Sequence, residues 1–368
     1  MEASIVQAAA RAALSRSVDE ATFRRIEAVM LPVLAILTSL VLFGAFVACL
    51  GKSPVELYEL IWRGSFGTAF SIQNSMQRSA PLLFTGLCVA LPAQLGLIII
   101  GGEGAFVLGG LAAAWAGIHL SGTGMVGILL MAVCGVLAGA VWIGLAGALR
   151  FYRGVNETIA SLLLSYLAIA VFNFLVEGPL RDPASLDKPS TATLSPDLQI
   201  GNIPGLAVHW GFPIGCVICI LASFVVTRTT FGFAARIAGG NARAAAVQGL
   251  PVGKLILWFT AGGGAAAGLA GMIEVSAVQG SANSALIAGY GYTGILIAFL
   301  ARQNPLGVIP VAILIGGIEA SGGFVQQRLN LPDATIVVLQ GMLFVMMLVF
   351  EALNGRLLPR RKRAEMQA

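Results

Sequence analysis

The side chains most able to do chemistry in this sequence are a few acidic, amide and tyrosine residues that interrupt long apolar stretches. Glu103 is the most distinctive, because it lies in the glycine-rich segment Gly101–Gly104 between two apolar runs. An ionisable side chain at membrane depth is costly and is a candidate for function by default. The glycines favour a break in the helix, and broken helices in membranes line cavities or binding sites. We expect Glu103 to line a pathway or join a structural network; a turn at the inner surface is the alternative.

Other polar residues border or interrupt apolar runs and could line the same route. Glu319 and Gln340 interrupt late runs, and Gly289–Gly294 combines two tyrosines with a flexible backbone. That segment could hold a ring-shaped solute or anchor a helix at the membrane interface. The residues that we predict for a substrate pathway are Gln94, Glu103, Asn173, Gln279, Asn283 and Tyr290.

The sequence offers little for covalent, metal or nucleotide chemistry. It contains no G-x-x-x-x-G-K-[ST], no H-E-x-x-H and no G-x-S-x-G pattern, so we expect it not to hydrolyse ATP itself. Its closest cysteine pair, Cys216 and Cys219, lies one helical turn apart on an apolar segment and reads as buried small hydrophobes. We predict no catalytic residues, no metal site and no bound cofactor.

Composition defines the solvent of this chain. Of 368 residues, 22 are Lys or Arg and 17 are Asp or Glu, which makes 11% charged, against about 25% in soluble domains. Mean hydropathy is +0.88. Too few polar residues remain to cover a surface in water, so lipid must surround most of the protein. The sequence predicts an all-α, polytopic helical membrane protein.

Apolar runs bounded by charges, glycines, prolines or polar loops predict about ten transmembrane helices, with eight to ten as the range. A spanning helix needs about 20 apolar residues. The third and eighth runs are short or interrupted by glycine. The predicted spans cover residues 28–50, 80–100, 104–119, 123–149, 157–176, 209–228, 255–273, 290–302, 306–324 and 334–352.

The distribution of basic residues predicts that both termini are cytoplasmic. With ten spans, sixteen of the 22 Lys and Arg residues fall on the side of the N-terminus and six on the other, and cytoplasmic loops carry this excess. Residues 1–27 read as a cytoplasmic segment without a signal peptide. The basic tail 353–368 reads as a topology anchor at anionic lipid and not as a nucleic-acid site. Between them, residues 28–352 form the transmembrane domain.

Two loops are too long to be simple turns. Segment 177–208 is proline-rich and polar and reads as an external cap. The cytoplasmic segment 229–254 carries glycines and the alanine-rich stretch Ala242–Ala246, which favours a short helix. Composition leaves open whether this segment is a solvated connector or a docking helix for a cytosolic partner. Elsewhere, Asn156 and Glu157 suit a helix start, and the glycines of 262–271 favour close helix packing.

Four motifs in order over about residues 80–320 resemble the permease subunits of bacterial ABC importers. The resemblance is to the nucleoside and simple-sugar branch of the branched-chain amino acid/ribose superfamily. Gly96–Ala105 resembles G-L-x-N-I-G-x-E-G-Q, and Asn156–Tyr166 resembles N-E-x-I…L-x-L-N-Y. Arg236–Gly249 resembles the coupling segment R-x-x-G-x-N-x-x-A-A-x-x-x-G, and Gly289–Gly307 resembles G-Y-G-x-x-G-I…P-L-G.

The resemblance implies specific roles and partners. Structural motif positions would be Gly101, Gly104, Asn156, Glu157, Gly289, Gly291 and Pro305. Coupling to the ATPase would use Arg236, Gly239, Asn241, Ala244, Ala245 and Gly249. The partners would be ABC ATPase subunits, a second permease chain (identical or different) and an extracytoplasmic solute-binding protein. The complex would lie in the bacterial inner membrane and import a nucleoside or simple sugar by alternating access.

Three positions depart from the family pattern, with Ile99 and Ser165 in place of asparagines and Ala105 in place of glutamine. Polar groups are therefore missing beside Glu103, which leaves the transport role intact and the solute open. The rival reading is a secondary transporter driven by an ion gradient, with Glu103 or Glu319 as proton carrier. It predicts uptake by this chain without an ATPase.

Overall fold

The computed structural model describes residues 30–185, 188–332 and 334–353. This part of the chain is all-helical, and its only strand-like pairings are two isolated bridges, Ser190 with Asn283 and Asn202 with His209. The predicted segment 1–27 and, apart from Leu353, the predicted tail 353–368 lie outside the described residues. The helices in order are Met30–Cys49, α2 (Pro54–Phe66), α3 (Ala69–Ala93), α4 (Gly102–His119), α5 (Met125–Arg153), α6 (Glu157–Glu177), η1 (Pro196–Leu198), α7 (Gly211–Arg228), α8 (Thr230–Gly240), α9 (Ala242–Val247), α10 (Val252–Glu274), η2 (Val275–Gln279), η3 (Ser284–Leu286), α11 (Tyr290–Leu300), α12 (Pro305–Ala320), α13 (Gly322–Leu329) and α14 (Ala334–Leu353).

Seven helical stretches among the described residues are long and apolar enough to span a membrane, fewer than the predicted ten. The others fall short for visible reasons. Polar residues occupy the first turns of α3, Glu103 and glycines lower the hydropathy of α4, and α11 has only 11 residues. The seven are Met30–Cys49, Met125–Arg153, Glu157–Glu177, Gly211–Arg228, Val252–Gln279, Pro305–Leu329 and Ala334–Leu353. The protein is thus a multi-pass membrane protein; ten spans and cytoplasmic termini stay predictions.

Several boundaries differ from the prediction. The run predicted as a span over 80–100 is helical only to Ala93: α3 begins earlier, at Ala69, and residues 97–100 belong to no helix or strand. The run over 306–324 is divided between α12 and α13 at Ser321. Apolar composition identified both runs, but it did not reveal where the helices α3 and α12 end.

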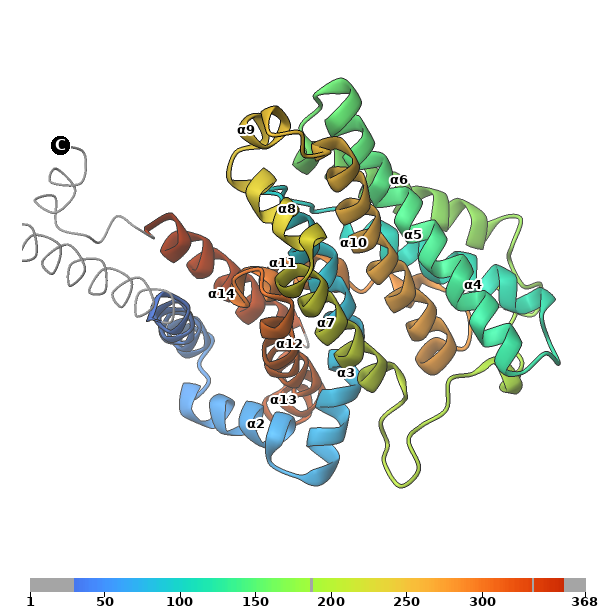
Figure 1. Ribbon diagram of the computed structural model, residues 1–368. Helices are drawn as coiled ribbons and strands as arrows, with labels where there is room; N and C mark the ends of the chain where they lie inside the picture. The colour runs from blue at the N-terminus through green and yellow to red at the C-terminus, as the bar shows by residue number, and fades with distance from the viewer. Residues whose placement is uncertain (1–29, 186–187, 333, 354–368) are drawn as a thin grey trace, which may run out of the picture. The chain divides into compact units, whose positions relative to one another are not determined.

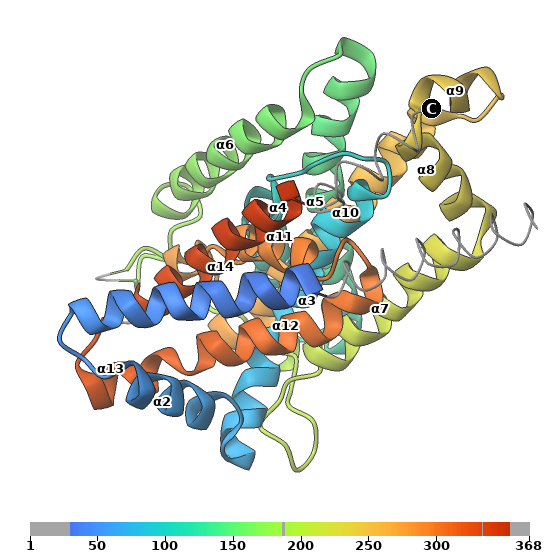
Figure 2. The same cartoon turned by 90° about the vertical axis from the view of Figure 1, so that its left-hand side faces the viewer.

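The chain divides into two compact units. One contains the helix Met30–Cys49 and α14, and the other comprises residues 57–333. In the larger unit, α3, α4, α10 and α11 pack on one another, and α5, α6, α7 and α12 surround them. Figure 2 shows α6 and α7 on opposite sides of this central group. The α8–α9 segment lies at one end of the unit, and the loop before α7 lies at the other (Figure 1).

Glycines allow the central helices to pack backbone against backbone. A Cβ added at Gly139 of α5 would overlap the backbone of Gly264 and Gly268 in α10, and one added at Gly109 of α4 would overlap Gly268. Small residues permit this approach between helices in lipid. The predicted close packing of the glycines in 262–271 is confirmed, and it fixes α10 as the helix on which α4 and α5 rest.

Candidate functional site

Glu103 lies in the first turn of α4 and is fully buried. Its two carboxylate oxygens accept hydrogen bonds from a second helix start: Oε1 from the amide of Gly289 (2.8 Å) and Oε2 from that of Gly291 (2.6 Å). A carboxylate near a helix N-terminus opposes the positive end of the helix dipole. Glu103 therefore serves two helix starts at once, its own in α4 and that of α11.

The glycines around Glu103 make this contact possible. A Cβ on Gly291 would overlap the backbone of Glu103 and Gly102, and a Cβ on Gly104 would overlap Ser165 in α6. Gly289 has φ +81°, a left-handed conformation that glycine adopts without strain. The predicted motif positions Gly101, Gly104, Gly289 and Gly291 thus all lie at or beside the contact between α4, α6 and α11.

The non-helical segment before Glu103 is held by hydroxyl groups of α6. Thr158 donates to the carbonyl of Ile98 (2.9 Å), Ser161 accepts from the amide of Ile100 (3.1 Å), and Ser165 accepts from the amide of Gly104 (3.2 Å). These bonds satisfy backbone groups that no helix pairs, which a buried segment requires. Sequence reasoning missed the role of Thr158 and Ser161, although hydroxyls three and four residues apart on a helix share one face.

The position of Ser165 changes the interpretation of the departures from the family pattern. Ser165 still supplies a hydrogen-bonding group next to Glu103. Ile99 and Ala105 are fully buried in one apolar cluster with Cys88, Ile143 and Ala267. Apolar side chains there fill a core. From the sequence alone, we interpret Ile99 and Ala105 as polar groups lost beside Glu103, whereas the structure buries both side chains in this apolar cluster.

Asn156 and Glu157 hold the start of α6 as predicted. The Asn156 side chain accepts hydrogen bonds from the amides of Thr158 and Ile159 (2.9 and 3.1 Å). Glu157 lies 3.3 Å from Arg150 at the end of α5. Asn304 caps α12 in the same way, with Pro305 at its first position. These residues fix where the helices begin, and that in turn positions the hydroxyls of α6.

The far end of α11 is also held by the segment that contains Glu103. The side chain of Gln94, which follows α3, donates to the carbonyl of Gln303 (2.8 Å) beyond the last turn of α11. Arg302 and Gln303 both have positive φ, so the chain reverses sharply there. Gln94 and Glu103, predicted to share one environment, instead form hydrogen bonds at opposite ends of α11.

The remaining predicted pathway residues are divided among different places. Gln279 donates to Oε1 of Glu274 (3.2 Å), Asn283 hydrogen-bonds Ser281, and Tyr290 packs edge-on against Phe106 at 5.6 Å. Asn173 lies on α6, which packs mainly on α4 and α5. Whether any of these side chains contacts a solute stays a prediction.

The loop between α6 and α7, predicted as an external cap, is hydrogen-bonded to the chain after α10. Backbone amides of Thr191, Leu194 and Ile200 donate to carbonyls of Ala282, Gly280 and Ser276, at 2.8–3.2 Å. Asp197 accepts from the amides of Gly122 and Gly124 (2.9 and 3.2 Å), between α4 and α5. A hydrogen bond from Ser195 and these amides lower the pKa of Asp197. Residues 190–200 therefore cover the turn that carries Gln279 and Asn283.

The predicted coupling segment forms two short helices and not one. Asn241 ends α8 and caps α9, accepting from the amide of Ala244 (3.0 Å). Ala245 is fully buried, whereas Ala244 is exposed and Val247 is 85% exposed. The buried face joins an apolar cluster formed by Leu95, Leu97, Val226, Ala235, Ala238, Ala245, Leu255 and Phe259.

This cluster connects the exposed helix α9 to the segment that leads to Glu103. Leu95 and Leu97 belong to it, and a Cβ on Gly239 would overlap the carbonyl of Gln94. Close-packed interiors transmit displacement and do not absorb it. Helix α9 and residues 94–97 are therefore parts of one packed apolar cluster.

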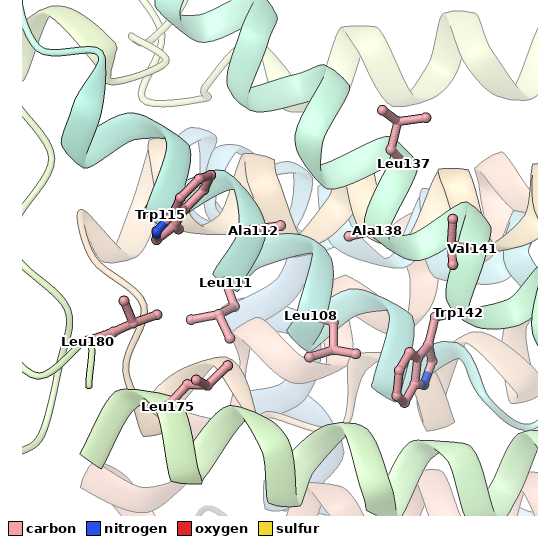
Figure 3. A pocket seen from close by; sticks show the side chains of 10 residues that line it. All are labelled: Leu108, Leu111, Ala112, Trp115, Leu137, Ala138, Val141, Trp142, Leu175 and Leu180. Atoms are coloured by element: carbon pink, nitrogen blue, oxygen red, sulfur yellow. The ribbon is translucent and has the colours of Figure 1, made fainter. Parts of the chain in front are cut away.

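A cavity in the described part of the chain is of another kind. It has a volume of about 620 Å³ and lies among α4, α5 and α6 (Figure 3). All its lining residues are apolar or aromatic, and the indole N–H of Trp142 already donates to the carbonyl of Leu164 (3.1 Å). A solute rich in hydroxyl groups would leave them unpaired there, so this cavity does not suit a polar solute.

The geometry defines a helical membrane protein in which two helices begin at one buried carboxylate and a short exposed helix packs on the segment leading to it. The model of the family described as branched-chain amino acid transport system / permease component matches residues 71–349. The chain belongs to this family, which confirms the resemblance.

Individual relatives are named as ABC transporter permeases. The glucose ABC transporter permease protein TsgB13 of Haloferax volcanii is 30% identical over 332 residues, which is 87% of each chain. The guanosine ABC transporter permease protein NupP of Bacillus subtilis is 28% identical over 80% of this chain and 86% of its own. The nucleoside ABC transporter permease protein NupB of Lactococcus lactis is 23% identical over 88% of this chain and 91% of its own.

Proposed function

We propose that this chain is the permease subunit of an ABC importer in the bacterial cytoplasmic (inner) membrane, and that it forms the pathway for a nucleoside or a simple sugar. The match of residues 71–349 to a permease family carries the proposal. The relatives named for glucose, guanosine and nucleosides support the class of solute. In this proposal the chain has no ATP site or cofactor of its own, and a separate ABC ATPase supplies the energy.

The proposed docking site for the ATPase is the exposed face of α9, with Arg236, Gly239, Asn241 and Gly249 shaping the two-helix segment. Ala244 would contact the ATPase, and Ala245 would connect α9 to the cluster beneath it. ATP-driven movement would displace residues 94–97 and, with them, the α4 and α11 helix starts at Glu103. A second permease chain would complete the pathway, and an extracytoplasmic solute-binding protein would deliver the solute.

The geometry at Glu103 does not favour it as the proton carrier of an ion-driven transporter. A proton carrier must exchange its proton with an aqueous route, yet Glu103 is fully buried and both of its oxygens accept backbone hydrogen bonds. Its contacts are those of a residue that fixes two helices.

Uptake in cells distinguishes the two energy sources. Cells that express this chain with its ATPase are given labelled glucose and labelled guanosine, with or without a protonophore and with or without a Walker-lysine substitution in the ATPase. The proposal predicts that the ATPase substitution abolishes uptake and that the protonophore, at constant cellular ATP, does not. Uptake that survives the ATPase substitution and collapses with the protonophore would contradict it.

A further inference from the structure

A second group of polar side chains joins four helices of the larger unit. Arg78 of α3 interacts electrostatically with Tyr290 at the start of α11, Glu274 at the end of α10 and Glu319 of α12, and it hydrogen-bonds the Tyr290 hydroxyl. Gln279 donates to Glu274 from the next turn. Arg78 falls between the predicted spans 28–50 and 80–100, whereas the structure places it within α3.

This polar cluster, formed by Arg78, Glu274, Gln279, Tyr290 and Glu319, is open on one side. Glu274 and Tyr290 are 5% and 7% exposed, but Arg78 is exposed. A guanidinium group has five N–H donors in a planar fork, more than a tyrosine hydroxyl can accept. The cluster therefore buries Glu274 and Tyr290, leaves Glu319 partly exposed and presents guanidinium donors at its surface, as a binding site does.

The parts of the cluster are held rigidly. Tyr290 follows Gly289, whose amide is bound by Glu103, and its ring packs on Phe106 of α4. Gln279 ends the π-helical turn η2, and residues 276–283 are bonded to the loop between α6 and α7. Sites on fixed elements are already ordered before a ligand binds.

We propose that Arg78, Glu274 and Tyr290 bind adjacent hydroxyl groups on the ring of the transported solute. A carboxyl group accepts hydrogen bonds from two neighbouring hydroxyls, and a guanidinium donates two in parallel. A neutral ring with a vicinal diol needs such a mixture of donors and acceptors close to an aromatic face. Glucose and the ribose of guanosine share this chemistry. Glucose and guanosine are the solutes in the names of two relatives.

This inference rests on the proposed function and specifies which part of the solute is read. The Tyr290 ring and the Phe106 ring lie at 66° to each other, so the cluster has an aromatic wall beside its polar groups. An apolar amino acid such as leucine has no diol to engage these groups. The apolar cavity of Figure 3 has no comparable set.

The test is ligand-observed NMR on the purified full chain in lipid nanodiscs, using saturation transfer to four probes. The probes are guanosine, 2′-deoxyguanosine, D-glucose and, as an unrelated solute, L-leucine. Wild type should give a stronger signal for guanosine than for 2′-deoxyguanosine, which lacks the vicinal diol. Arg78→Ala and Glu274→Gln should weaken the diol signals about five- to tenfold, as loss of paired hydrogen bonds implies, and should remove the difference between guanosine and its deoxy analogue.

Two further variants make the comparison decisive. Arg63→Ala removes an arginine from an exposed ion pair with Glu59 and should behave as wild type. Tyr290→Phe removes one hydroxyl and keeps the ring, so it reports on the cluster if Arg78→Ala does not yield a monodisperse protein. Wild-type diol preference in both Tyr290→Phe and Glu274→Gln would overturn the inference, as would equal signals from leucine and glucose in wild type.

The two proposals fail separately. Uptake that depends on the ATPase, together with normal diol binding by the cluster variants, would reject the cluster and leave the permease function standing. Uptake without any ATPase would reject the permease function, and the binding comparison on the purified chain would still decide the role of Arg78.

Discussion

Two of the segments that resemble the family, Gly96–Ala105 and Arg236–Gly249, are held in opposite ways. The first is largely buried and is fixed by directional hydrogen bonds with the hydroxyls of Thr158, Ser161 and Ser165. The second keeps one face in an apolar cluster and exposes the other. Glu103, an acidic residue in an apolar stretch, thus fixes two helix starts, while one face of the short helix α9 is exposed, where we propose that a partner docks. Hydrogen bonds fix the geometry of the segment at Glu103, whereas α9 packs on an apolar cluster through one face and can be displaced by a partner that binds the other.

Among the substitutions that compare the two segments, the largest loss of stability is expected at Glu103. Glu103→Ala leaves two backbone amides unpaired, and at about 1–3 kcal/mol each the free energy of unfolding should fall by about 2–6 kcal/mol. Glu103→Gln keeps one acceptor oxygen and should lose about half as much. Unfolding followed in detergent by tryptophan fluorescence measures this.

Glu59→Ala, in an exposed ion pair of α2, is the matched control and should change stability by less than about 1 kcal/mol. Stability of Glu103→Ala within that same range would show that the carboxylate does not join the two helix starts. Full transport activity in Glu103→Gln would exclude a role of Glu103 in the solute pathway and leave it a structural role only.

Next in size is the packing of α10, on which the buried segment rests. Gly268→Val forces a side chain into the backbones of Gly135 and Gly139, and overpacking of this kind costs about 1–3 kcal/mol. Gly144→Ala on α5 is the control, because its Cβ would make only ordinary contacts with Ala261. The prediction is wrong if both variants unfold at the wild-type temperature.

The sequence predicted some of this architecture and missed the rest for identifiable reasons. Hydropathy predicted the all-helical fold, and the capping role of Asn156 followed from residue type alone. The end of α3 at Ala93 was not predictable, because residues 94–100 are as apolar as a helix interior. The contact of Glu103 with Gly289 joins positions far apart in sequence, and the pairing of Arg78 with Tyr290 requires helix orientations that one sequence does not specify.

A smaller, functional effect is expected on the exposed segment. Ala244→Glu should leave stability unchanged and reduce ATPase-dependent uptake about tenfold, which corresponds to about 1.4 kcal/mol of docking free energy. Ala245→Glu places a charge in the apolar cluster and should lower the melting temperature as well. Uptake and thermal stability are measured on the same preparations. Equal behaviour of the two variants would contradict the assignment of one exposed and one buried alanine.

The smallest effect is the pH dependence of the stability of segment 190–200, which contains Asp197. Hydrogen bonds lower the folded-state pKa of Asp197, so its ionised form stabilises the loop above the unfolded pKa of about 3.9. That contribution is lost as pH falls through the lowered value. Limited proteolysis of segment 190–200 from pH 6 to pH 3 should accelerate at the acid end in wild type. Asp197→Asn should cleave faster at pH 6 and show a flatter profile; an identical profile would exclude the contact.

The central claim is that this chain conducts a solute only when an ATPase drives it through α9. The direct measurement is uptake of labelled glucose and guanosine into vesicles that contain the purified chain, its binding protein and its ATPase, with each component omitted in turn. The account predicts accumulation of at least one solute in the complete system and none without the ATPase. Accumulation by the chain alone, driven by a proton gradient, would contradict it.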